Sequence, residues 1–152
     1  MRELLISRKQ TIAVAESVTA GFLQSALALA QYASEFFQGG ITVYNLNQKV
    51  RHLSVDPVHA MACNCVSEEV AAQMAGHVSK IFNSDWGLAI TGYSSPIPEK
   101  NIYDLYACYA IYFRDKEIVR HTITSGEGAA PKIIHFYAEQ LFMHFEKILC
   151  EE

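Results

Sequence analysis

The residues best suited to chemistry form a short polar turn, Glu16-Ser17-Val18-Thr19-Ala20-Gly21. The residues before it, 11–15, are an apolar run that is typical of a buried strand, and residues 22–30 are rich in Leu and Ala, which favour helix. A strand, a turn and a helix in this order direct backbone N–H groups to one point above the end of a sheet. Such a point can bind an anion or stabilise an oxyanion. The alternative is that Ser17 and Thr19 only cap the helix.

The elements that must position this turn alternate along the rest of the chain. Further strands are predicted at residues 41–44, 85–91, 105–114 and 117–124, the last two joined by a tight hairpin, while residues 36–40 read as a turn. Helices are predicted at residues 1–10, 19–32, 48–53 and 132–149, and from a Ser67 cap to about Phe82. This order predicts one domain over residues 1–152, an α/β fold built as a three-layer α/β/α sandwich with a mixed sheet.

The composition restricts the class of protein. The chain has 152 residues, of which 51% are hydrophobic and 18% are charged, and its net charge is -4. The low charge leaves apolar surface to cover, so we expect a homo-oligomer. The negative balance argues against nucleic-acid binding through the phosphate backbone.

Cysteine and histidine give no metal signal. The four cysteines include Cys63-Asn64-Cys65, which lacks the spacing of a zinc or redox pair, and the six histidines form no H-x-x-x-H pair. We therefore expect no metal site and no cofactor. The N-terminal residues read as an ordinary helix rather than a signal peptide or a membrane span, which predicts a cytoplasmic protein with no membrane partner.

Several short motifs follow one another in an order that defines a family. They are the turn after the first strand, Ala15-Glu16-Ser17-Val18-Thr19-Ala20-Gly21; Ser34 before Phe36-Phe37-Gln38-Gly39-Gly40; Tyr44 followed by Lys49; the helix start at 66–71; and Ile90-Thr91-Gly92. In this order they resemble the C-terminal domain of the CinA family (competence/damage-inducible protein), over nearly the whole chain. That family includes nicotinamide-nucleotide amidases, which deamidate nicotinamide mononucleotide.

The resemblance implies an amidase site. Ser17 would be the nucleophile, with Lys49 and Tyr44 as base and proton relay; such a lysine works as a base only when burial or a neighbouring cation lowers its pKa. The resemblance also implies a nucleotide substrate, and Ser34 ranks behind Ser17 as nucleophile. The other residues expected to line the substrate site are Glu16, Thr19, Ala20, Gly21, Ser34, Gly40, Thr91 and Gly92.

The sequence also departs from the family pattern near the ligand. Val18 and Ala20 stand where the family has Cys and Gly, residues 93–100 replace a Gly-rich loop, and Gly126-Glu127-Gly128 lacks the family's Arg. Losing Gly removes close backbone approach, and losing Arg removes a bidentate phosphate donor. The alternative hypothesis is therefore a member that binds a nucleotide without turnover, or an oligomeric scaffold.

Overall fold

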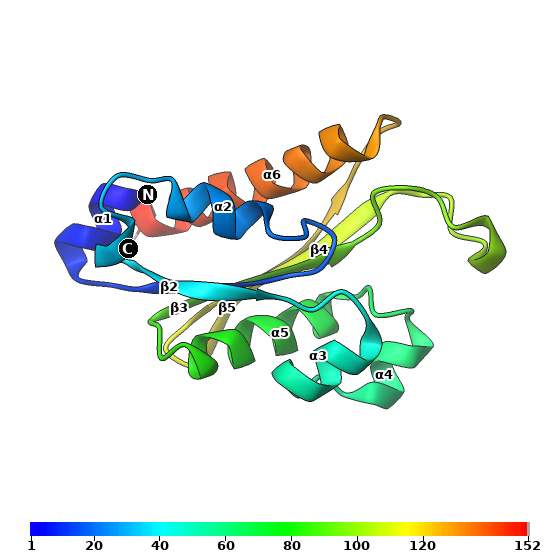
Figure 1. Ribbon diagram of the computed structural model, residues 1–152, viewed down its shortest axis with the longest axis horizontal. Helices are drawn as coiled ribbons and strands as arrows, with labels where there is room; N and C mark the ends of the chain where they lie inside the picture. Colours follow the sequence, from blue (N-terminus) through cyan, green and yellow to red (C-terminus); the bar gives the residue numbers. More distant parts are fainter. Residues whose placement is uncertain (152) are drawn as a thin grey trace.

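A mixed sheet runs through the centre of the protein (Figure 1), which a computed structural model describes over residues 1–151. The last residue of the predicted domain, Glu152, lies outside the described residues. The five strands have the order β2-β1-β3-β4-β5, with β1 parallel to both β2 and β3 and with antiparallel pairing from β3 through β5. Their bounds are β1 Ile12–Glu16, β2 Phe37–Thr42, β3 Trp86–Gly92, β4 Tyr106–Phe113 and β5 Lys116–Thr124.

Helices cover both faces of this sheet, so the predicted three-layer α/β/α sandwich is confirmed (Figure 1). On one face lie α2 and α6, with α1 beside them, and on the other lie α3, α4 and α5. Their bounds are α1 Arg2–Arg8, α2 Phe22–Ala28, α3 Leu46–Leu53, α4 Pro57–Ala62, α5 Glu68–Ile81 and α6 Ala130–Glu151, with short 3-10 turns at Ala33–Glu35 and Pro98–Lys100. None of the helices in residues 1–151 is both long enough and apolar enough to cross a membrane.

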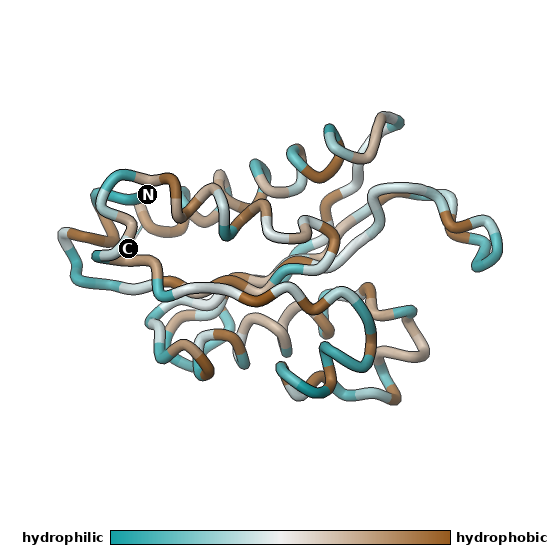
Figure 2. Tube along the Cα trace, viewed as in Figure 1, coloured by the Kyte–Doolittle hydropathy of each residue, from teal (hydrophilic) through white to brown (hydrophobic). Residues whose placement is uncertain are grey.

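Burial follows the apolar runs of the sequence. Every residue of β1 is buried, as is all of β3 except its last residue, because helices cover the sheet on both faces. The hydropathy of the chain shows the same division, with apolar residues along the strands and hydrophilic residues in the outer turns (Figure 2). The sheet is therefore a fixed base on which its end loops are held.

Two predicted boundaries near the site are wrong. The second strand includes residues 37–40, which the sequence read as a turn because of Gly39-Gly40. A side chain at Gly40 would lie 2.6 Å from Gln24 Cγ and 2.7 Å from Val14 Cγ2, so glycine is needed where α2 crosses the strands. The predicted helix at 19–32 begins later, at Phe22, because the preceding residues are held in a turn. The sequence also missed α4, whose first turn is capped by Asp56.

The carboxyl ends of β1, β2 and β3 meet at one edge because these three strands are parallel. The segments that leave them are residues 17–21, 43–45 and 93–105. This is the edge at which open α/β sheets commonly bind ligands.

Candidate active site

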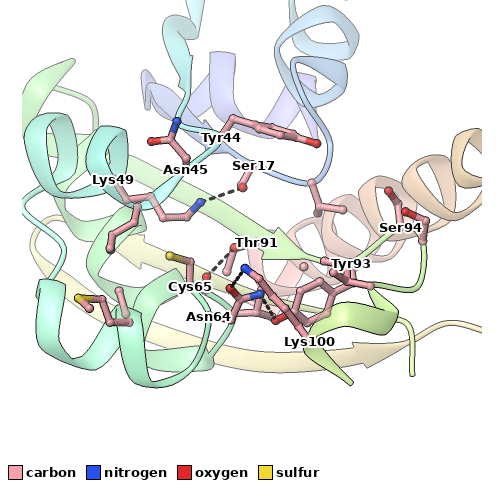
Figure 3. A pocket seen from close by; sticks show the side chains of 18 residues that line it. Ser17, Tyr44, Asn45, Lys49, Asn64, Cys65, Thr91, Tyr93, Ser94 and Lys100 are labelled. Atoms are coloured by element: carbon pink, nitrogen blue, oxygen red, sulfur yellow. Dashed lines mark hydrogen bonds between the residues drawn. The ribbon is translucent and has the colours of Figure 1, made fainter. Parts of the chain in front are cut away.

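A cleft of about 550 Å³ opens at this edge of the sheet, a volume suited to a small ligand (Figure 3). Its walls come from four separate segments: the turn after β1, the start of α3 with the residues before it, the end of α4 with the loop after it, and the loop after β3. Ser17, Tyr44, Lys49, Thr91 and Gly92 are the predicted site residues that line it.

Ser17 and Lys49 form a buried hydrogen-bonded pair at the base of the cleft. The distance from Lys49 Nζ to Ser17 Oγ is 2.9 Å, and the side chains point toward each other (Figure 3). Ser17 is 7% exposed and Lys49 is 1% exposed. The Ser17 N–H donates to the carbonyl of Ile90 at 3.1 Å, which fixes the serine directly beyond the end of β1.

Helix α3 brings Lys49 to this position. The Asn45 side chain accepts from the Gln48 N–H at 3.1 Å and so caps the helix. Immediately before the cap, the Val43 N–H donates to the Glu16 carbonyl at 2.8 Å and ties the approach to β1. Lys49 Nζ also donates to the Val43 carbonyl at 2.9 Å, so its position is fixed by hydrogen bonds to both Ser17 and Val43.

The surroundings of Lys49 favour the neutral amine. Within residues 1–151 no carboxylate lies within ion-pair distance of it, and its two hydrogen-bond partners are neutral oxygens. Burial therefore lowers the pKa of Lys49, and a charge on the nearby Cys65 thiol opposes that shift only in part. Burial likewise raises the pKa of Cys65, and the neighbouring Lys49 opposes that shift. A neutral lysine beside a serine hydroxyl can accept its proton.

Tyr44 and Thr91 occupy different walls of the cleft. Tyr44 is 74% exposed and extends over Ser17, and its hydroxyl has no hydrogen bond to another described residue (Figure 3). Thr91 is buried, and its Oγ1 donates to the carbonyl of Cys65 at 2.9 Å. Thr91 thus fixes the segment that carries Cys65, whereas Tyr44 is placed to contact a ligand at the mouth.

Glu16, Thr19, Ala20 and Gly21, which the sequence assigned to substrate binding, lie outside the lining of the cleft. The Glu16 carboxylate is fully buried and accepts four hydrogen bonds, from Thr19 Oγ1 at 2.6 Å and from the N–H groups of Gly21, Leu23 and Gln24 at 2.8–3.1 Å. The first N–H groups of a helix have no acceptors within that helix. The Glu16 carboxylate accepts hydrogen bonds from these groups at the start of α2.

The same turn keeps a left-handed backbone in spite of its substitution. Ala20 has φ 45° and Gly21 has φ 102°, so the methyl group of Ala20 has not moved the turn out of this region. The Ala20 N–H donates to the carbonyl of Ser17 at 3.2 Å and the Gly21 N–H donates to Glu16. Both N–H groups therefore already have acceptors within the turn, whereas the expected role in holding a ligand covered residues 19–21 and stays a prediction.

The structure does not bring Ser34 or Gly40 to the cleft. Ser34 lies in the 3-10 turn before β2, at the amino end of that strand, whereas the cleft lies beyond its carboxyl end. Its side chain is exposed. Gly40 lies within β2 beneath α2, where the close packing described above excludes a side chain.

Sequence reasoning missed a polar group on the opposite wall from Ser17. Lys100 Nζ donates to Asn64 Oδ1 at 2.7 Å, and Asn64 Nδ2 donates to the Tyr93 hydroxyl at 3.1 Å (Figure 3). Asn64 and Cys65 are consecutive residues with φ 50° and 63°. The sequence signal that could have indicated Lys100 is a cationic residue in the loop after a parallel strand. No local sequence pattern indicates a role for Asn64. Among residues 1–151, no group of three or more His, Cys, Asp and Glu side chains could hold a metal ion.

Fold and cleft together define an α/β/α domain with a buried serine–lysine pair at the carboxyl ends of parallel strands. The family model described as the CinA C-terminal domain matches residues 1–130. The chain belongs to the CinA family, as its motifs indicated.

Relatives and solved structures agree with this assignment. A CinA-like protein of Picosynechococcus is 33% identical over 135 residues, covering 88% of this chain and 32% of that protein. A putative competence-damage inducible protein of Alkaliphilus oremlandii is 39% identical over 94 residues, covering 62% of this chain and 23% of that protein. The chain thus spans about a third or less of the curated relatives it matches. The crystal structure of a competence or damage-inducible protein from Enterobacter asburiae has a TM-score of 0.88 at 25% identity, covering 97% of this chain and 92% of that one.

Proposed function

We propose that this chain is an amidohydrolase that converts a nicotinamide nucleotide to the corresponding acid and ammonia. The observation that carries the proposal is the 2.9 Å contact between Ser17 Oγ and the buried Lys49 Nζ. A nucleophile and its base must lie within hydrogen-bond reach before any other requirement matters. The nicotinamide nucleotide as substrate comes from the likeness to the family, and the geometry supports amide hydrolysis of a small ligand.

The chemistry follows from the pair. Ser17 Oγ attacks the amide carbonyl carbon while its proton passes to the neutral amine of Lys49, and a tetrahedral intermediate forms. Lys49 returns the proton as the C–N bond breaks, so ammonia leaves and an ester on Ser17 remains. Water, deprotonated by Lys49, then hydrolyses that ester and restores the serine. The net reaction consumes one water and yields the acid and ammonia.

The oxyanion of that intermediate needs N–H donors that have no other acceptor. The N–H group of Val18 has no hydrogen bond to another described residue, and Val18 lines the cleft beside Ser17. This donor takes the place of the N–H groups of Ala20 and Gly21, which already have acceptors within the turn. One such donor typically contributes about 10²–10³-fold in rate.

One observation favours a second candidate, a nucleotide-binding protein without turnover. The Tyr44 hydroxyl has no hydrogen bond to Ser17 or to Lys49 within the described structure, so the predicted proton relay is not assembled without a ligand. A bound ligand would have to complete it.

Ammonia release from nicotinamide mononucleotide tests the two candidates. We expect turnover by the full chain, and loss of at least about 10³-fold in Ser17→Ala, because the nucleophile is removed. Ser34→Ala is the matched control, since it removes a hydroxyl at the opposite end of β2 and should retain full activity. Full turnover by Ser17→Ala would exclude the assigned nucleophile. Binding of the mononucleotide with no ammonia release would establish the second candidate instead.

A further inference from the structure

The lining of the cleft contains two amines and no carboxylate. Among the described residues that line it, Lys49 and Lys100 are the only members of the Lys, Arg, Asp and Glu set. Lys49 is buried, bonded to Ser17 and Val43, and its pKa is lowered. Lys100 is exposed at the rim of the cleft. The mouth of the cleft therefore favours an anionic group, and the cation that attracts it is Lys100.

Backbone hydrogen bonds within the loop fix the conformation of the segment that carries Lys100. Ile97 and Ile102 exchange two backbone hydrogen bonds of 2.8 and 3.1 Å and close a small bridge. Between them, the 3-10 turn Pro98–Lys100 starts with a proline, whose ring fixes φ. The Lys100 N–H donates to the Ile97 carbonyl at 3.0 Å, so the backbone under this lysine is held.

The same bonds decide how the loop can recognise an anion. In a glycine-rich loop, backbone N–H groups surround a phosphate directly. Here the N–H groups of Ile97, Lys100 and Ile102 all donate to carbonyls of the loop itself. These three N–H groups are therefore not available to a ligand, and the Lys100 side chain is the cation that this segment offers instead.

The Lys100 side chain is oriented for that role. It extends across the cleft to Asn64, whose Oδ1 it contacts at 2.7 Å, while the Asn64 amide donates to the Tyr93 hydroxyl at 3.1 Å (Figure 3). An ammonium has three donors, and within residues 1–151 only Asn64 accepts from this one. The remaining donors can bind a ligand oxygen, and the hydroxyl-bearing Ser94 and Ser95 share the same lining.

We propose that Lys100 is the phosphate-recognition residue of this site, holding the phosphomonoester of a nucleotide while its amide faces Ser17. The proposal rests on the proposed function for the identity of the nucleotide. Asn64 and Tyr93 are positioning residues, because they hold the ammonium rather than the ligand. A lysine binds phosphate as a point charge, so one side chain can supply the attraction that the N–H groups of Ile97, Lys100 and Ile102 do not offer.

The test measures binding by calorimetry in the Ser17→Ala background, so that no turnover interferes. The probes are nicotinamide mononucleotide, nicotinamide riboside and inorganic phosphate. We expect Lys100→Gln to raise Kd for the mononucleotide at least about tenfold, because a charge-assisted hydrogen bond is lost, and to leave Kd for the riboside within about twofold. Lys100→Arg should restore most of the affinity. Lys116→Gln, at the far hairpin, removes an equal charge and should change neither value.

The outcomes separate this proposal from the amidase. Phosphate-dependent affinity that vanishes in Lys100→Gln supports it, even if wild-type chain releases no ammonia; in that case only the amidase proposal fails. Equal mononucleotide affinity in Lys100→Gln and its parent overturns it, whatever the turnover. Binding of the riboside as tightly as the mononucleotide by the parent, or no binding of any phosphate-bearing probe, overturns it as well.

Discussion

The end of β1 and the helix after β2 each contain one buried ionisable side chain, and the two have opposite surroundings. Glu16, at the end of β1, has four donors around its carboxylate and no exposed surface. Lys49, in α3, is equally buried but contacts only two neutral oxygens. Val43 joins the two regions, since it donates to the Glu16 carbonyl and accepts from Lys49.

The difference shows how burial can serve either the fold or the chemistry. A buried carboxylate with a full set of donors holds a helix and has nothing left for a ligand. A buried amine without a counter-ion is destabilised in its charged form, which is what a base needs. Equal burial thus marks two different roles, and the partners distinguish them.

The largest expected effect comes from removing the base. Lys49→Met should lower turnover about 10³-fold, because no other described group is bonded to Ser17 Oγ to take its proton. It should not reduce the free energy of unfolding, because an apolar side chain of similar length replaces a desolvated amine. Ammonia release and urea denaturation measure the two quantities. A Lys49→Met protein that unfolds more easily and still turns over would reverse the assigned roles.

The dependence on pH gives an independent check of Lys49. Its pKa in the folded state lies below the ordinary 10.5, so kcat/KM should rise with pH and level off below that value. Between the lowered pKa and 10.5 the unfolded chain binds more protons at this site than the folded chain. Stability contributed by this residue therefore rises with pH across that window. The Lys49→Met variant should lose that component, while the contribution of Cys65 remains.

Replacing the buried Glu16 should affect the free energy of unfolding more than it affects turnover. Glu16→Gln replaces an acceptor of four hydrogen bonds with a group that can accept fewer, leaving buried donors unpaired. We expect the free energy of unfolding to fall by about 2–4 kcal/mol, measured by urea denaturation. Glu139→Gln, an exposed change on α6, is the control and should stay within about 0.5 kcal/mol. Unchanged stability in Glu16→Gln together with weaker ligand binding would return Glu16 to the substrate site.

The smallest effect is expected at Ala20. Glycine would relieve the left-handed strain at φ 45°, worth about 1–2 kcal/mol, but would also give the unfolded chain more freedom. The Ala20→Gly variant should therefore change the free energy of unfolding by less than about 1 kcal/mol and turnover by less than about twofold. Thermal denaturation and ammonia release check both values. A large gain in turnover would show that the methyl displaces Ser17.

Sequence patterns could predict the three layers of the fold and the pairing of Ser17 with Lys49, but not the role of each residue in the motif around Ser17. The apolar runs of β1 and β3 and the cap at Ser67 were readable because burial and capping are local. Glu16 lies in the same motif as Ser17, and only the fold shows that one faces the helix and the other faces the cleft.

Other parts of the site depend on contacts between distant segments. The link from Lys100 to Asn64 joins residues with no common local pattern, and the predicted strand boundary failed at Gly40 because its close packing involves α2 and β1. The expected homo-oligomer stays a prediction.

The position of β2 has a consequence for how the proposed activity would be lost. It is one of the two edge strands of the sheet and pairs on one side only, with β1. Edge elements open at lower free energy than central ones. Opening β2 would carry Val43 and α3 away from β1, separating Lys49 from Ser17 while β3, β4 and β5 stay paired. Inactivation on warming should therefore precede unfolding of the bulk of the chain, so that an assay of activity would report a lower midpoint than an optical melt.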